Sequence, residues 1–136
     1  MKTEPISFRP SEELDSRLNR MRERTGIPKS RLVEQLADEA ERCRRYPGLA
    51  FRGPDLRRRA WVIGSPFDVW EIVEAWQDLA EDEAKVREQL DLTPRQLKLS
   101  LSYYREFTDE IDAALRLQRR PVEALATAYP FIAVVE

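Results

Sequence analysis

Two of the four residues "ISFR" at positions 6–9 carry side chains that can donate hydrogen bonds, and one residue separates the two. Apolar and polar residues alternate there with the two-residue period of a β-strand. Ile6 and Phe8 therefore share one face, and Ser7 and Arg9 share the other. A two-stranded antiparallel ribbon fits the major groove of DNA, where outward donors reach base edges. Ser7 and Arg9 are therefore candidate DNA-reading residues.

Two helices are expected to position this strand. Ser11 suits a helix N-cap and Gly26 suits a helix stop, which predicts a helix over residues 12–25. A second amphipathic helix is expected from Pro28 to about residue 45. A strand and two helices of this size can bury little apolar surface alone, and a lone strand leaves its backbone unpaired. We therefore expect two copies to pair their strands antiparallel and to share one core.

The stretches "ISFRPSEELDSRL" and "RTGIPKSRLVEQLADEA" resemble the ribbon-helix-helix family of DNA-binding proteins. The resemblance implies that outward strand residues read bases and that the start of the second helix holds a phosphate. The residues so implicated are Thr3 or Pro5 at the outer site, then Ser7, Arg9, Lys29, Ser30 and Arg31. Pro5 offers no donor, and Pro10 is expected to end the ribbon early, so both depart from the family pattern. The alternative is a purely structural strand at the edge of an α+β sheet.

The middle of the chain predicts a hairpin followed by helices. Turn signals at Pro47-Gly48 and Gly53-Pro54 bracket two short strands, residues 49–52 and 59–63. The cluster Arg57-Arg58-Arg59 lies at the hairpin tip and is expected either to touch a phosphate or to be solvated. Ser65-Pro66 is expected to start the next helix, whose apolar face is broad and whose other face is acidic. An acidic face repels a phosphate backbone, so this helix should not lie on DNA.

A helix-turn-helix shape is expected over residues 81–107. A short helix ends near Leu92, and Thr93 to Gln96 have the form of a capping box that opens the next helix. That second helix has side chains of types that meet DNA: Arg95, Gln96, Lys98, Ser100 and Ser102. The alternative is a dimerisation or scaffold module without DNA contact. A last helix is expected from Thr108 to about residue 117.

The stretch from about Tyr46 to Leu117, with "RRAWVIGSPFDVW" and "LDLTPRQLKLSLSYY", resembles a bacterial antitoxin family long described only as a domain of unknown function. The resemblance implies a homeodomain-like or winged helix-turn-helix fold. It also implies a VapB-like antitoxin of a two-gene system, with a ribonuclease toxin resembling PIN domains as partner.

The tail, residues 118–136, starts basic and ends apolar. Its β-prone run would aggregate if left bare, so it must be covered. It is expected either to pack within the homodimer or to lie on the toxin. The candidate toxin-binding residues are Tyr129, Phe131, Ile132 and Val134.

Composition narrows the classes of function. The chain of 136 residues has no histidine, four glycines and one cysteine, which disfavours histidine-based catalysis, a Cys-x-x-Cys metal site and a glycine-rich phosphate loop. No enzyme activity, cofactor or metal is expected.

The net charge is −2, but residues 1–45 have 11 Lys and Arg against 9 Asp and Glu. The first segment is therefore the one expected to contact phosphate. No apolar run has the length of a membrane span, and a cytoplasmic protein is expected.

These observations combine into one prediction. The fold is mainly α with short β: a ribbon-helix-helix dimer over residues 1–45, a hairpin and helix-turn-helix domain over 46–117, and the tail over 118–136. The expected function is an antitoxin that binds double-stranded operator DNA as a homodimer or as a dimer of dimers, represses its own transcription and neutralises the toxin. A stand-alone homodimeric repressor and a protein-binding scaffold without DNA contact are the alternatives.

Overall fold

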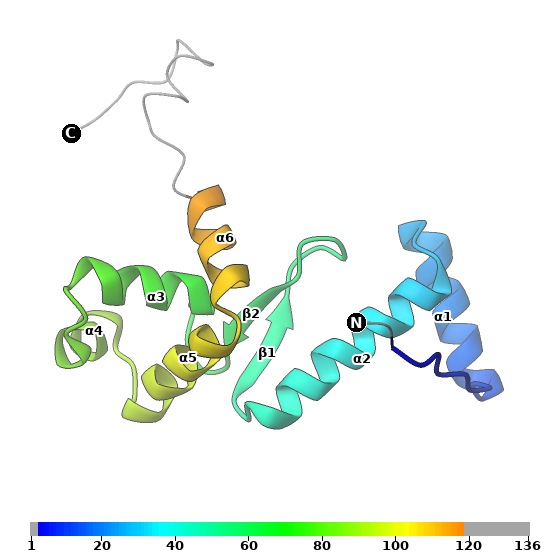
Figure 1. Cartoon of the computed structure of the whole chain (residues 1–136), viewed down its shortest axis with the longest axis horizontal. Coiled ribbons are helices and arrows are strands. Elements are labelled where there is room, and N and C mark those ends of the chain that lie inside the picture. The colour runs from blue at the N-terminus through cyan, green and yellow to red at the C-terminus, as the bar shows by residue number, and fades with distance from the viewer. Residues whose placement is uncertain (1–2, 119–136) are drawn as a thin grey trace, which may run out of the picture. The chain divides into compact units, whose positions relative to one another are not determined.

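The structure, a computed structural model, describes residues 3–118. The chain divides into two compact units, residues 1–45 and 46–136. The described part is mainly helical, with one small antiparallel sheet, as the sequence predicts (Figure 1). The first unit contains α1 (Glu12–Thr25) and α2 (Lys29–Arg45). The second contains β1 (Leu49–Arg52), β2 (Arg59–Val62), α3 (Val69–Asp78), α4 (Glu83–Leu90), α5 (Pro94–Glu106) and α6 (Thr108–Gln118).

Local signals set the ends of α1 as expected. The Ser11 hydroxyl accepts a hydrogen bond from the amide of Leu14 at 3.2 Å, which caps the first turn. Gly26 takes the left-handed conformation, with φ of 74°, and donates its amide to the Arg22 carbonyl at 2.8 Å. This turn reverses the chain, so that α2 packs on α1.

The first unit buries very little by itself. Leu18 is the buried side chain of α1, and Leu32 is that of α2. Leu36, on the predicted apolar face of α2, remains 42% exposed. Two helices with one buried leucine each bury far less apolar surface than an independent domain needs.

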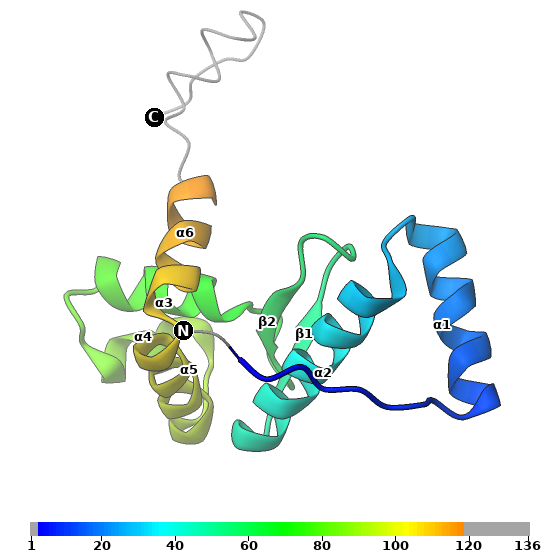
Figure 2. The ribbon, with the colours of Figure 1, turned by 45° about the vertical axis from the view of Figure 1, so that its right-hand side comes forward.

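The segment before α1 is extended but forms no strand within the described chain, as Figure 2 shows. Ile6 is 92% exposed and Phe8 is 58% exposed. The predicted ribbon requires a second copy of this segment, and a single chain has none to offer. The paired strand therefore stays a prediction.

The hairpin of the second unit is confirmed. β1 and β2 pair antiparallel, with Leu49 opposite Val62 and Arg52 opposite Arg59. β2 ends at Val62, one residue earlier than expected. Leu49 and Val62 are buried at this end of the hairpin, which faces α3.

The predicted start of α3 at Ser65-Pro66 is wrong, because the helix begins at Val69. Phe67 and Asp68 are held extended beside β2: the Val62 amide donates to the Phe67 carbonyl at 3.2 Å, and Asp68 forms a β-bridge with Trp61. The Ser65 hydroxyl accepts from the Phe67 amide at 3.1 Å and so shapes the turn rather than the helix. Asp68 is the N-cap, and its amide donates to the Glu71 carboxylate at 3.0 Å.

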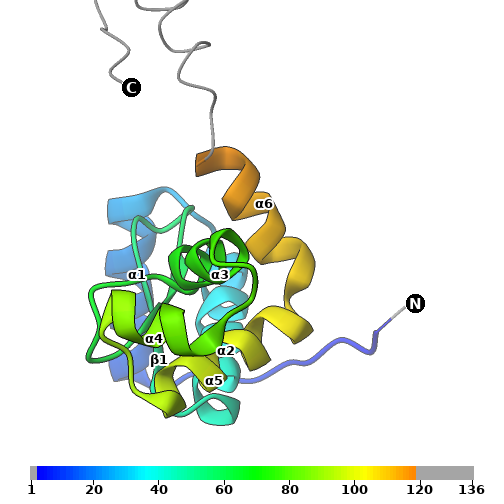
Figure 3. The same cartoon turned by 90° about the vertical axis from the view of Figure 1, so that its left-hand side faces the viewer.

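The core of the second unit is built around α3, which packs against α4, α5 and α6. α5 and α6 run in different directions after the break at Phe107 (Figure 3). The fully buried side chains include Val69, Ile72, Val73, Val86, Leu97 and Tyr103. Within residues 3–118, no helix combines the length and the apolar character needed to cross a bilayer.

Candidate nucleic-acid interface

The predicted DNA-reading residues of the first unit lie on an accessible segment. Thr3, Ser7 and Arg9 are all exposed. Ser7 also lines a hollow of about 310 Å³ together with Lys29 and Ser30. The apolar lining of this hollow comes from Ile6, Phe8, Pro10, Leu18 and Val33. The structure thus brings a predicted base-reading residue near the predicted phosphate site, while Arg9 and Arg31 do not line this hollow.

Lys29 has a role that the sequence did not indicate. Its ammonium donates to the Asp15 carboxylate at 2.7 Å and to the Asn19 side-chain oxygen at 3.0 Å. The hydrogen bond from Lys29 holds the pKa of Asp15 below its ordinary value. Asp15 and Lys29 are 14 positions apart, so no helical spacing in the sequence could have revealed the pair.

The start of α2 remains suited to an anion through its backbone. The first amide groups of a helix have no acceptor within the helix, and they point along its axis. The first turn of α2 contains no acidic residue that would compete for them. Ser30 and Arg31 are exposed there. A phosphate at this end would therefore be bound mainly by amides, with the Lys29 charge already shared with Asp15.

The second candidate surface is α5, where the structure separates the predicted residues into two groups. Arg95 and Lys98 are exposed. Both polar atoms of the Gln96 side chain are hydrogen-bonded within the protein. Its oxygen accepts from the Thr93 amide at 2.9 Å, and its nitrogen donates to the Ile63 carbonyl at 3.3 Å. The capping box is thus confirmed, since the Thr93 hydroxyl also accepts from the Gln96 amide at 3.1 Å.

The interpretation of Ser100 as a DNA-facing residue is wrong. Ser100 is fully buried, and its hydroxyl donates to the Gln96 carbonyl at 2.9 Å. The alternation of leucines in the sequence obscured which face of α5 points inward. Ser102, the other serine on this helix, is half-buried.

The arginines around the hairpin are mostly engaged in structure. Asp68, only 4% exposed, accepts from the guanidinium of Arg52 at 2.7 Å and from that of Arg59 at 2.8 Å. Arg58 donates to the backbone carbonyls of Gly53 and Phe51, both at 3.0 Å. Arg58 and Arg59 of the predicted basic cluster are thus bound within the hairpin and Arg57 is exposed, so the cluster as a whole is no ready phosphate site.

The face formed by α3 and α4 has the opposite charge. A hollow of about 280 Å³ lies between these helices. Its acidic lining is Glu71, Glu74 and Asp78, and its other lining residues are Phe67, Ala75, Leu79, Gln89 and Leu90. Such a face repels a phosphate backbone, and the absence of α3 from the DNA contact stays a prediction.

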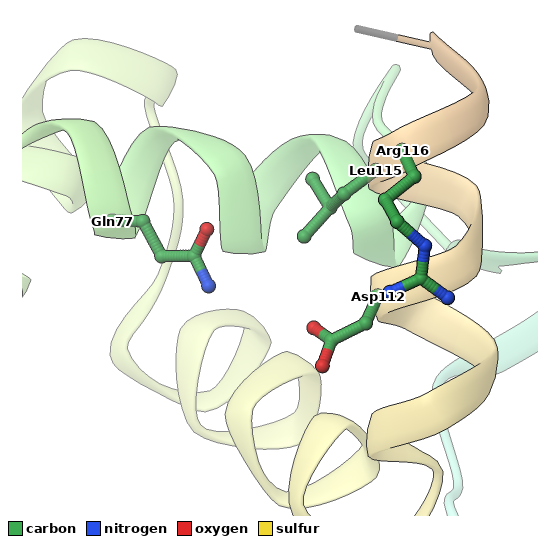
Figure 4. Close-up of a pocket in the computed structure, with 4 residues that line it drawn as sticks. All are labelled: Gln77, Asp112, Leu115 and Arg116. Atoms are coloured by element: carbon green, nitrogen blue, oxygen red, sulfur yellow. The ribbon is translucent and has the colours of Figure 1, made fainter.

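A further hollow of about 380 Å³ lies between α3 and α6. In Figure 4, Gln77 of α3 points toward Asp112 of α6, with Leu115 and Arg116 above. The Tyr104 hydroxyl lies between the two helices: it donates to Asp112 at 2.8 Å and accepts from Gln77 at 3.4 Å. The bond to Asp112 raises the pKa of Tyr104. These bonds connect three helices, which accounts for the polar lining.

The predicted toxin-binding residues Tyr129, Phe131, Ile132 and Val134 lie outside the described residues. Among residues 3–118 no group of three or more acidic or cysteine side chains is arranged to hold a metal ion. Comparison with known proteins found no matching family model, no matching curated protein and no matching solved structure.

Proposed function

We propose that this protein is a homodimer that binds operator DNA through a ribbon formed by two copies of residues 6–9. The observation that carries the proposal is the exposure of Ile6 and Phe8, at 92% and 58%, on an extended segment. Pairing with a second copy would bury both side chains and satisfy the backbone groups of the strand. It would also cover the part of α2 around Leu36 that the single chain leaves in water.

The polar face of the same segment gives the dimer its DNA contact. When Ile6 and Phe8 turn into the shared core, Ser7 and Arg9 turn outward. An arginine on a ribbon in the major groove can donate two hydrogen bonds to a guanine. The amides at the start of α2 would then hold a phosphate, in agreement with the absence of acidic residues in its first turn.

The test uses a duplex that covers the DNA directly upstream of the gene, and an unrelated duplex of equal length. We expect Arg9→Ala to weaken binding to the upstream duplex by about 1–3 kcal/mol. Binding to the unrelated duplex should change much less, because that binding depends on phosphate contacts. Arg20→Ala removes an equal charge from the exposed surface of α1 and is the matched control. If Arg9→Ala and Arg20→Ala bind the upstream duplex equally well, Arg9 does not read bases.

We further propose that the dimer is an antitoxin, as the resemblance of residues 46–117 implies. The acidic face of α3 and α4 supports a protein partner for the second unit, because it disfavours DNA and would attract a basic surface. A ribonuclease must present a basic surface to its substrate, so charge would favour this pairing. Co-expression with the product of the adjacent gene tests the role. The expected result is a stable complex in which the ribonuclease activity of that product is suppressed. If this protein does not bind the product, it would be a stand-alone repressor.

A further inference from the structure

The exposed cations of α5 lie along one stripe of the helix. Arg95, Lys98 and Arg105 are exposed, and Ser102 between them is half-buried. At 100° per residue these four positions fall within roughly 80° of arc. The opposite side of α5 is the buried side, with Leu97, Ser100 and Tyr103. We call these four residues the α5 basic stripe.

The net charge of this stripe is positive. Among residues 3–118, the side chains of Arg95, Lys98 and Arg105 form no ion pair, whereas Arg52 and Arg59 of the same unit share the buried Asp68. The sole acidic residue in the sequence of α5 is Glu106, at its last position. Its position falls about 20° from that of Arg95 around the helix, so the stripe has three cations against one carboxylate at its end. This excess concentrates positive potential in a unit whose α3 is acidic.

The polar side chains that could read bases are withdrawn from this face. Thr93 and Gln96 cap each other, and Gln96 also bonds to Ile63. Ser100 is buried. A recognition helix reads base edges with residues near its N-terminus. Here the uncharged polar residues near the N-terminus, Thr93 and Gln96, are committed to holding α5 in place, and what remains exposed is a row of charges.

We propose that the α5 basic stripe is a second, sequence-independent contact with the phosphate backbone of duplex DNA. From Arg95 to Arg105 the stripe extends roughly 15 Å along the helix axis. That length covers the axial spacing of about four phosphates of one strand. The proposal rests on the proposed DNA-binding function of the protein, but on residues of the other unit, so it can fail alone.

The experiment measures binding of the full chain to a 30-base-pair duplex of unrelated sequence, and to the upstream duplex, from 50 to 200 mM salt. The variant is Arg95→Gln/Lys98→Gln/Arg105→Gln, which removes the three charges and keeps polar side chains of similar helix propensity. Each lost phosphate contact lowers the slope of log K against log salt by about 0.9, so the slope should fall by about 2.7 for each bound chain. Between the two salt concentrations wild-type affinity should then drop more than that of the variant, by a factor of about 40 for each chain whose stripe contacts the duplex.

The matched control is Lys85→Gln/Arg87→Gln/Arg116→Gln, which removes three exposed cations from α4 and α6. This control should keep the wild-type slope. The slope depends on cations that contact phosphate, and these three cations lie outside the proposed contact. The ratio of the affinity for the upstream duplex to the affinity for the unrelated duplex should stay unchanged in the stripe variant. That ratio depends on base reading, which is assigned to Arg9. An unchanged slope, equal effects of both triple variants, or loss of the affinity ratio would overturn the proposal. Circular dichroism and urea unfolding confirm that both variants are folded.

Discussion

Asp68 joins the hairpin to α3, and its partners suggest a large effect on stability. Its carboxylate is 4% exposed and accepts from Arg52, Arg59 and the indole of Trp70. The Arg52 guanidinium also lies 5.2 Å from the centre of the Trp61 ring. Breaking a fully buried ion pair costs about 3–5 kcal/mol. The two arginines are 37% and 39% exposed, so water would solvate them in part once the carboxylate is gone.

We therefore expect Asp68→Ala to lower the free energy of unfolding by about 2 kcal/mol, below the value for a fully buried pair. Urea denaturation followed by tryptophan fluorescence measures this, since Trp61 and Trp70 surround the site. Asp109→Ala, at an exposed position of α6, should change stability far less. Equal stability of the two variants would mean that the Asp68 bonds contribute nothing net.

At the scale of elements, the contact of α1 with α2 should depend on pH through Asp15. The hydrogen bond from Lys29 lowers the pKa of Asp15 from its ordinary value of 3.8. A lowered pKa in the folded state means that the contribution to stability is present above pH 3.8 and is lost as the pH falls through the folded value. Lys29→Met should therefore lower the free energy of unfolding at neutral pH. The difference in this free energy from wild type should vanish once the pH is below the folded-state pKa of Asp15.

An NMR titration of the Asp15 carboxyl carbon checks the cause directly. In Lys29→Met its pKa should rise toward the ordinary value, whereas in Lys85→Met, which alters an exposed lysine of α4, it should not move. A pKa of Asp15 that is the same in all three proteins would contradict the assigned role of Lys29.

The elements whose signals are local could be predicted from the sequence. The Ser11 cap, the Gly26 stop and the Thr93–Gln96 capping box each depend on residues within four positions, and each is present. The start of α3 was missed because Asp68 is bound by Arg52 and Arg59, which are 16 and 9 positions earlier. The Asp15–Lys29 pair was missed for the same reason. Long-range partners leave no periodic trace in a single sequence.

The site could be predicted only in part, for a related reason. Exposure of Arg9, Arg95 and Lys98 agrees with the expected role of these residues at a surface. The alternating leucines and serines of α5 did not show that Ser100 points inward, because that depends on how α5 packs against α3. Nor could residue types show that the amide of Gln96 is taken up by Ile63, 33 positions away.

At the scale of the whole molecule, the proposed DNA binding depends on the association of two copies of the chain. The first unit has one buried leucine on each helix and two exposed apolar residues on its extended segment. A second copy would supply the missing strand, the missing core and the symmetry that a palindromic operator requires. Dimer formation and DNA binding should therefore be lost together when the apolar face of residues 6–9 is made polar.

Hydrogen exchange of the backbone amides of residues 6–9, measured residue by residue by NMR, tests the ribbon most directly. In a two-stranded antiparallel pair, alternate residues exchange hydrogen bonds with the partner strand. We therefore predict slow exchange at alternate positions of this segment, lost in the Ile6→Ser/Phe8→Ser variant while the amides of α5 stay protected. Exchange at all four positions as fast as in a short unstructured peptide would contradict the central claim.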